Sequence, residues 1–301
     1  MPNEYKFFTA DVFTDTIFGG NQLAVLPTAQ GLDDKTMQQI AREFNLSETV
    51  FIFPPETSSG TRKVRIFTPG RELPFAGHPT VGAAFVLAEI GGIALDGDET
   101  RIVFEEGVGP VPVLIRAKNG RPFFSQLFAA KMPEFGPPPP SVEELAAVLS
   151  LEPEQIRSAG RAPAALSCGV KFLFVAVRDL AALAQARVQG SEWERHVRNY
   201  WAREIFVFTE KADDADVRAR MFAPEMGIVE DPATGSAAAA LTGYLTPPDA
   251  ANGTRRWLVR QGVEMGRPST LEVEADIDDG KIVAVRVGGA SVLVSEGTLR
   301  I

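Results

Sequence analysis

Glu48, His78 and Asp231 are the side chains of this sequence whose chemistry and spacing suit proton transfer. His78 lies in "LPFAGHPTVGAA" (73–84) and Asp231 in "VEDPATGSAAAA" (229–240), so each precedes a proline and then a segment of small apolar residues. Histidine exchanges a proton near neutral pH, whereas aspartate is among the preferred helix N-caps. We interpret both residues as N-caps of equivalent helices. Two helix N-termini that face each other across a cleft would hold a small anionic substrate.

Glu48 follows a turn and precedes the apolar stretch "TVFIF". A glutamate in this position is either an exposed turn residue or, within an apolar cleft, a carboxyl group whose pKa rises until it can serve as a general base. Position in the sequence leaves both interpretations open.

Ser236 and Cys168 are two further side chains with reactive groups. Ser236 follows Asp231 among alanines and is either a small packing residue or a hydroxyl directed at a ligand. The stretch "TGSAA" differs from the GxSxG motif of hydrolases, which disfavours serine hydrolysis. Apolar neighbours predict that Cys168 is a buried residue and not a nucleophile.

The composition excludes several classes of protein. The chain has 30 Lys and Arg against 39 Asp and Glu, a net charge of −9 without a dense basic cluster, which disfavours nucleic acid and anionic membranes as partners. One cysteine and two histidines rule out an internal disulfide and four-cysteine or Cys₂His₂ zinc sites. No apolar run approaches the roughly 20 residues of a membrane span, and charges interrupt the N-terminal region where a secretory signal would be apolar. We expect a cytoplasmic protein that binds no metal.

The pattern of apolar residues predicts the elements that position these groups. "YKFFTADVF" and "QLAVLP" read as a hairpin, and residues 33–44 as an amphipathic helix. "TVFIF" and "RKVRIFTP" should pair, which places Glu48 at the start of a strand. "HPTVGAAFVLAEIGG" and "DPATGSAAAALTGYL" predict two helices that are apolar on all sides and therefore buried.

Similar residues flank both predicted helices, with "RIFTP" before the first and "RMFAP" before the second. Self-similarity over so long a period indicates a duplicated unit. The sequence predicts an α+β fold of two similar domains, each a curved sheet or open barrel around a central buried helix. We place the domains at residues 1–135 and 136–301, with the polyproline stretch "FGPPPPSVEEL" near their boundary and the last strands free to return to the first domain.

Five ordered blocks resemble the PhzF-like phenazine-biosynthesis family: "DVFTDTIFGGNQLAVL", "NLSETVFI", "RIFTPGRELPFAGHPTVGAA", "EDPATGSAAAAL" and "QGVEMGRPS". The resemblance runs from near residue 7 to about residue 269. It implies the diaminopimelate epimerase-like fold, a homodimer and cofactor-independent isomerisation of a small carboxylic acid, which in the best-studied members is dihydro-hydroxyanthranilate. Gln22 stands where the family has proline.

The resemblance also implies roles for matching residues. Glu48 is the expected acid/base, with His78 and Asp231 in the catalytic set, and Gly77, Gly235 and Ser236 are the expected substrate-binding residues. Related racemases use two cysteines, and a two-thiol mechanism is excluded because His78, Asp231 and Ser236 occupy the helix starts.

The resulting hypothesis is an isomerase that moves a carbon-bound proton on a small amino or hydroxy carboxylic acid. Two alternatives stay open: an amino-acid racemase or epimerase that uses Glu48 with His78 or Asp231, and a non-catalytic protein that binds a small molecule.

Overall fold

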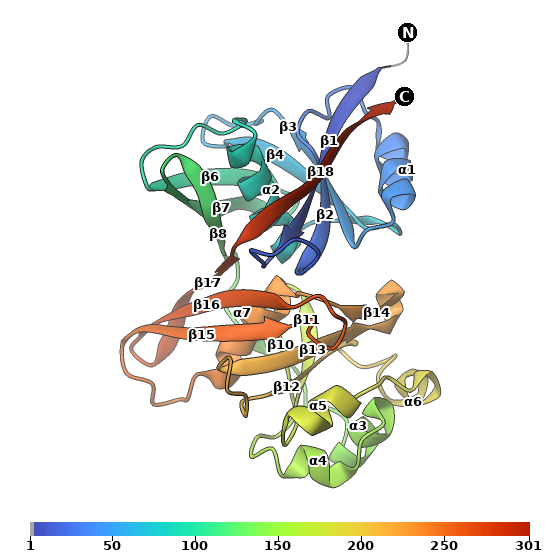
Figure 1. Cartoon of the computed structure of the whole chain (residues 1–301). Helices are drawn as coiled ribbons and strands as arrows, with labels where there is room; N and C mark the ends of the chain where they lie inside the picture. The colour runs from blue at the N-terminus through green and yellow to red at the C-terminus, as the bar shows by residue number, and fades with distance from the viewer. Residues whose placement is uncertain (1–2) are drawn as a thin grey trace. The chain divides into compact units, whose positions relative to one another are not determined.

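The computed structural model describes residues 3–301, which form two compact units. One unit contains residues 3–128 and 287–301, and the other contains residues 129–286. Both consist mainly of strands around one buried helix, the mixed α+β composition that the sequence predicts (Figure 1). The domain boundary near residue 135 and the origin of the units by duplication stay predictions.

The first unit is a curved sheet wrapped around helix α2 (Gly77–Glu89). β1 lies between β2 and β18, β2 runs parallel to β3, and β4 runs parallel to β6, whereas the other neighbours are antiparallel. The strands are β1 (Glu4–Val12), β2 (Asn21–Leu26), β3 (Glu48–Phe53), β4 (Arg62–Phe67), β5 (Glu72–Leu73), β6 (Glu99–Glu106), β7 (Gly109–Lys118), β8 (Arg121–Phe128) and β18 (Ser291–Arg300).

Helix α2 is buried from Gly77 to Ala88, as its apolar sequence predicts. Strands β1, β2, β3, β7, β8 and β18 all contact it. A side chain at Gly82 would come within 2.5 Å of Val12 Cγ2 and 2.6 Å of Leu23 Cδ2, so the helix approaches the sheet closely because glycine is present.

Helix α1 (Asp34–Phe44) packs on the outside of this sheet, as Figure 1 shows. Asp33 caps its first turn and accepts a hydrogen bond from the Thr36 backbone N–H. Met37, Ile40 and Ala41 form its buried face. The hairpin β1–β2, helix α1 and the pair β3–β4 confirm the elements predicted for this region.

The second unit repeats this order of neighbours around helix α7 (Gly235–Leu245). β11 runs parallel to β12 and β13 runs parallel to β15, with antiparallel neighbours between and beside them. The strands are β9 (Glu134–Phe135), β10 (Ala164–Ser167), β11 (Lys171–Ala176), β12 (Glu204–Thr209), β13 (Val217–Ala223), β14 (Ile228–Asp231), β15 (Gly253–Gln261), β16 (Ser269–Asp278) and β17 (Lys281–Gly289), whose last residues belong to the first unit.

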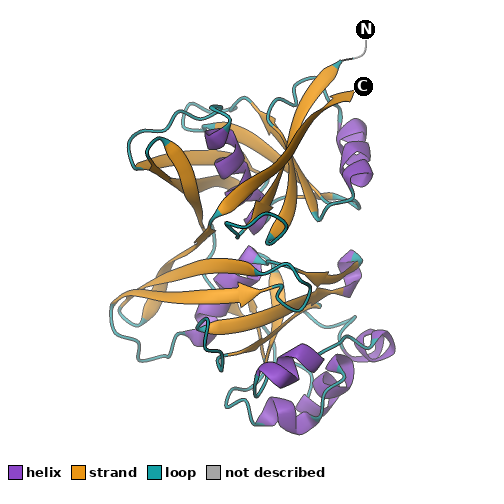
Figure 2. Cartoon of the chain, in the orientation of Figure 1, coloured by secondary structure: helices purple, strands orange, loops and turns teal. Residues whose placement is uncertain are grey.

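Four short helices gather at one end of the second unit, separate from α7 (Figure 2). Leu145, Leu149, Ile156 and Trp193 belong to the apolar cluster that joins these helices to the sheet. Ser141 and Glu144 form a capping box at the start of the first of them. The helices are α3 (Val142–Leu149), α4 (Pro153–Arg157), α5 (Leu180–Gln185) and α6 (Gly190–His196), and a single 3₁₀ turn, η1 (Pro224–Met226), follows β13.

The predicted N-caps are wrong at both buried helices. Ala76 is the N-cap of α2, so His78 lies inside the first turn. Thr234 is the N-cap of α7, and Asp231 ends β14 before the helix begins. The proline that follows each residue is compatible with extended backbone as well as with a helix start, so the sequence pattern alone does not locate the first turn.

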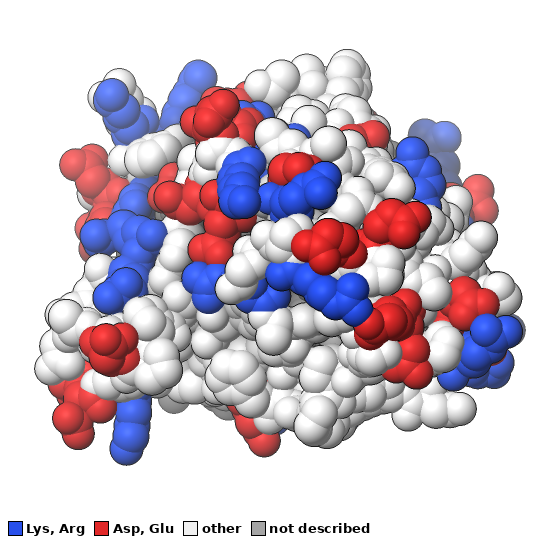
Figure 3. Space-filling view, turned by 90° about the horizontal axis from the view of Figure 1, so that it is seen from below, with Lys and Arg blue, Asp and Glu red and all other residues white. Residues whose placement is uncertain are grey.

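Among residues 3–301, the helices are all too short or too polar to cross a bilayer. On the face shown in Figure 3, basic and acidic side chains are interspersed and form no extensive area of one sign.

Candidate active site

Glu48 and His78 lie in contact inside the first unit. Glu48 is the first residue of β3, and His78 is the second residue of α2. Glu48 Oε2 lies 3.2 Å from His78 Nε2, and the two side chains are only 11% and 6% exposed. A carboxyl group and an imidazole at this distance can pass a proton between them or hold it for a substrate. The interpretation of Glu48 as an exposed turn residue is therefore wrong.

Parallel pairing of β2 with β3 positions Glu48, because Leu23 lies opposite it in the register. Strand β1 ends at Val12. The loop that follows β1 leads to Asn21, the first residue of β2. Asn21 is fully buried, and its Nδ2 lies 3.2 Å from His78 Nδ1. Both ring nitrogens of His78 thus face polar side chains, which orients the ring.

Sequence reasoning missed Asn21. It lies in the block "GGNQ", directly before Gln22. Glycines in this block allow a close approach, because a Cβ at Gly20 would lie 2.4 Å from Val12 O and the residue has a φ of +60°. A buried asparagine directly after two glycines is the signal that could have indicated a polar contact in the core.

Burial lowers the pKa of His78 to about 3, and a hydrogen bond with the backbone of Gln22 opposes this shift. The imidazole is therefore neutral at physiological pH. Its contact with Glu48 is therefore one between a neutral ring and a carboxyl group, and not an ion pair with an imidazolium.

Asp231 is the corresponding buried carboxyl group of the second unit. Its Oδ2 accepts a hydrogen bond of 2.6 Å from Thr234 Oγ1. Gln261, the last residue of β15, is fully buried and joins the two: its Nε2 donates to Asp231 O at 2.7 Å and to Thr234 Oγ1 at 3.0 Å, and its Oε1 accepts from Thr234 N. Gln261 therefore fixes the segment that leads from Asp231 into α7. The sequence pattern did not indicate a role for Gln261.

Gly235 and Ser236, two of the expected substrate-binding residues, are the first residues of α7. Ser236 is half-buried and lies in the first turn of α7, where the unpaired N–H groups of a helix start are found. Gly77 has the same place as the first residue of α2. The structure thus puts Gly77, Glu48 and His78 together in one unit, and Asp231, Gly235 and Ser236 together in the other.

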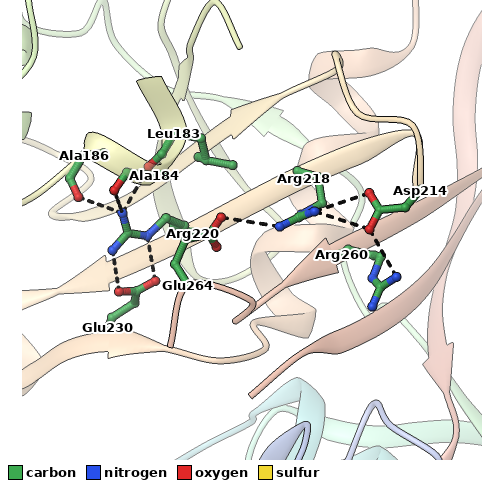
Figure 4. Close-up of polar contacts among 9 residues, drawn as sticks. All are labelled: Leu183, Ala184, Ala186, Asp214, Arg218, Arg220, Glu230, Arg260 and Glu264. Atoms are coloured by element: carbon green, nitrogen blue, oxygen red, sulfur yellow. Dashed lines mark hydrogen bonds and ion pairs between the residues drawn. The ribbon is translucent and has the colours of Figure 1, made fainter. Parts of the chain in front are cut away.

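Arg220 supports the strand that ends in Asp231. Its guanidinium forms a bidentate pair with Glu230, at 2.8 and 2.7 Å, and is almost fully buried (Figure 4). The remaining nitrogen donates to the backbone carbonyls of Leu183, Ala184 and Ala186. This arrangement fixes β14 against β13 one residue before Asp231.

A second arginine, Arg218, holds the loop after β15. It contacts Asp214 at 3.3 Å and Glu264 at 3.4 Å, as Figure 4 shows. The loop lies against the residue after Asp231, because a Cβ at Gly262 would come within 2.6 Å of Pro232 O. The block "QGVEMGRPS" therefore buttresses the start of α7.

Cys168 is buried, as predicted, and burial raises the pKa of its thiol to about 12. The thiolate is therefore absent at neutral pH, which makes this residue unsuited to nucleophilic catalysis. Among residues 3–301, no three His, Cys, Asp or Glu side chains are arranged to hold a metal ion.

Comparison with known proteins identifies the family. The model of the phenazine biosynthesis-like protein family (PhzC-PhzF) matches residues 10–297. An uncharacterized isomerase of Mesorhizobium japonicum is 39% identical over 300 residues, 98% of each chain. The trans-2,3-dihydro-3-hydroxyanthranilate isomerase of Pseudomonas aeruginosa is 31% identical over 97% of this chain and 98% of its own. The solved structure of a predicted epimerase from Pseudomonas aeruginosa has a TM-score of 0.80 and 30% identity, and the match covers 98% and 99% of the two chains.

The chain belongs to the phenazine biosynthesis-like family, which confirms the resemblance seen in the sequence. It is an enzyme of the isomerase class with an epimerase-like fold. The isomerase names of its relatives go against the alternative of a non-catalytic binding protein.

Proposed function

We propose that this protein is a cofactor-independent isomerase that moves a carbon-bound proton on a small amino or hydroxy carboxylic acid. The observation that carries the proposal is the buried contact between Glu48 and the neutral His78 at the start of α2. Glu48 removes the proton from carbon and returns it, and His78 relays or orients it. This is general acid/base catalysis by groups that the fold holds in place.

The substrate-binding part of the proposal assigns Gly77 of the first unit, and Gly235, Ser236 and Asp231 of the second, to substrate binding. Helix starts favour a carboxylate through unpaired N–H groups and positive dipole charge. Asp231 is fixed by Thr234 and Gln261, and Ser236 offers a hydroxyl beside it in the chain. A helix start that can bind a polar group of a substrate in each unit would explain why the chain forms this junction twice.

Solvent-deuterium incorporation tests the proposal. The protein would be incubated in D₂O, without added cofactor, with trans-2,3-dihydro-3-hydroxyanthranilate and a panel of small amino and hydroxy acids, and followed by NMR. We expect deuterium to enter one compound with the wild-type protein and not with Glu48→Gln. The absence of exchange across the panel, or equal exchange by the variant, would contradict it.

A second candidate function is epimerisation of an amino acid by Glu48 together with His78 or Asp231. The similarity to a predicted epimerase favours it. Movement of a double bond changes the ultraviolet spectrum of the substrate, whereas epimerisation changes only its handedness. Chiral chromatography of the deuterated product therefore distinguishes the two reactions.

We further propose a homodimer, which the family resemblance implies. Light scattering coupled to size-exclusion chromatography tests it, because a protomer of 32.5 kDa should elute with twice that mass.

A further inference from the structure

Glu106 is a buried carboxyl group that the proposed mechanism does not use. It is the last residue of β6, and its Oε1 lies 2.7 Å from Thr80 Oγ1 in the first turn of α2. Its other oxygen, Oε2, is buried and has no hydrogen-bond partner among residues 3–301. A carboxylate in such surroundings would lose its hydration without compensation, which disfavours the charged form.

The single hydroxyl hydrogen of Thr80 also indicates that Glu106 is in the neutral form. Thr80 Oγ1 lies 2.8 Å from Ala76 O as well as 2.7 Å from Glu106 Oε1. A hydroxyl group has one hydrogen, and it serves only one of these two neighbours. If Thr80 donates to the Ala76 carbonyl, which can only accept, Glu106 must donate the second hydrogen. A protonated Glu106 satisfies both contacts, and a carboxylate leaves two oxygens facing each other without a hydrogen between them.

Gln261 has the same place in the second unit. It is the last residue of β15, and its side chain also reaches a threonine hydroxyl at the start of the buried helix. The amide of glutamine is neutral and can donate. A carboxylic acid that keeps its proton is the nearest chemical equivalent of that amide, so Glu106 and Gln261 serve the same structural purpose in their own units.

The charges around Glu106 do not offer it a counter-ion. A cavity of about 530 Å³ borders Glu106, and its other charged lining residues are Glu56, Lys63, Arg65, Glu72 and Glu105. The two cations already bind other carboxylates, Lys63 that of Glu56 and Arg65 that of Glu72. The titratable residues of helix α2 are the neutral His78 in its first turn and Glu89 at its opposite end, and β7 places Gly109 opposite Glu106.

The backbone holds Glu106 against the segment that leads into α2. Val108 N donates to Pro74 O at 3.1 Å, and a Cβ at Gly107 would come within 2.8 Å of Pro74 Cα. The backbone next to Glu106 is therefore fixed beside the start of α2.

We propose that Glu106 is a positioning residue that holds the start of α2, and with it His78, in the form of a neutral carboxylic acid. Burial raises the pKa of Glu106 to about 8, although a hydrogen bond donated by Thr80 to the carboxylate would lower it. Ionisation in the weakly alkaline range removes the donor to Thr80 and puts a charge beside the turn that contains His78. The effect of Glu106 on catalysis rests on the proposed function, whereas the protonation of Glu106 does not depend on that function.

The test uses NMR of the whole protein with glutamate labelled at Cδ and histidine labelled at the ring nitrogens. Glu106→Gln assigns the Glu106 signal by its disappearance, and the sequence has only two histidines to resolve. We expect the Glu106 signal to titrate near pH 8. The ring signals of His78 should move with the same midpoint in the wild type and stay unchanged in Glu106→Gln. Titration of Glu106 near its ordinary value of 4.5 would overturn the inference whether or not a substrate is found.

The kinetic arm compares kcat/KM from pH 6 to pH 9. The wild type should lose activity about tenfold between pH 7 and pH 9, as a single ionisation near pH 8 requires, and Glu106→Gln should not. An alkaline decline that persists in Glu106→Gln would assign it to another group and overturn the positioning role. Glu105→Gln is the matched control: hydrogen bonds from Glu56 N and Thr57 lower the pKa of Glu105, so this variant should keep the wild-type alkaline profile.

Discussion

His78 Nε2 lies 3.2 Å from Glu48 Oε2, although one residue belongs to a buried helix and the other to the first position of a strand. The contact exists because β3 begins beside the start of α2, and because the sheet encloses that helix. A carboxyl group is thereby removed from water and given one defined neighbour. Such an environment is typical of groups that exchange protons with a substrate.

Glu48→Gln should abolish most of the catalytic activity. The amide keeps the size of the side chain but cannot take up a proton, and loss of a general acid/base group lowers the rate by about 10²- to 10⁴-fold. Deuterium incorporation into the substrate measures the effect. Glu43→Gln, which changes an exposed glutamate of α1, should retain wild-type activity, and circular dichroism should show both variants folded.

His78 should make the protein less stable in acid. Its pKa is 6.5 in the unfolded chain and about 3 in the folded protein, so between these values only the unfolded state binds the proton. The contribution of neutral His78 to the free energy of unfolding is fully present above pH 6.5 and is lost as the pH falls toward 3. At pH 5 the loss amounts to about 2 kcal/mol. Urea unfolding at pH 5 and 7 measures it. The difference should vanish in His78→Gln and persist in His196→Gln.

Gln261→Leu should destabilise the protein by about 1–3 kcal/mol, because Thr234 N and Asp231 O would lose their partners in the core. Substrate affinity should fall as well if Asp231 contacts the substrate. Chemical unfolding and KM are the two measurements. Gln30→Leu makes the same substitution at an exposed glutamine and should change neither the stability nor KM. Equal stability of Gln261→Leu and the wild type would refute the supporting role of Gln261.

Arg220→Met should cost about 3–5 kcal/mol, because it leaves Glu230 buried without its partner. The double variant Arg220→Met/Glu230→Leu should recover part of this loss, since no charge then stays buried. For comparison, Arg198→Met removes an exposed pair with Glu194 and should change stability by less than about 1 kcal/mol. The measurement is the free energy of unfolding of the wild type and of the three variants.

The sequence predicted those elements whose local pattern of residues is sufficient to define them. Helix α1 has a polar cap and an apolar stripe, and α2 and α7 are apolar on every side. The start of a strand at Glu48 followed from the apolar run behind it. These features depend only on residues that are close together in the chain, so they can be predicted from a single sequence.

The groups that the sequence did not reveal are defined by contacts between distant residues. Asn21 matters because the loop before β2 returns to α2, and Gln261 matters because β15 ends beside Thr234. Glu106 had a local signal that was not used. In "ETRIVFEE" the alternation of a strand puts Thr100, Ile102 and Phe104 on the buried face, and Glu106 continues that series.

Strand β1 is paired along its length with β18, from Glu4 opposite Arg300 to Val12 opposite Ser291. Residues 4–12 and residues 291–300 lie far apart in the sequence, whereas residues 129–286 form one continuous stretch. The second unit can therefore complete its sheet from a single continuous segment. The first unit keeps an open strand edge, a surface that favours aggregation, until β18 pairs with β1. Folding of the first unit thus depends on a pairing between residues that are distant in the chain.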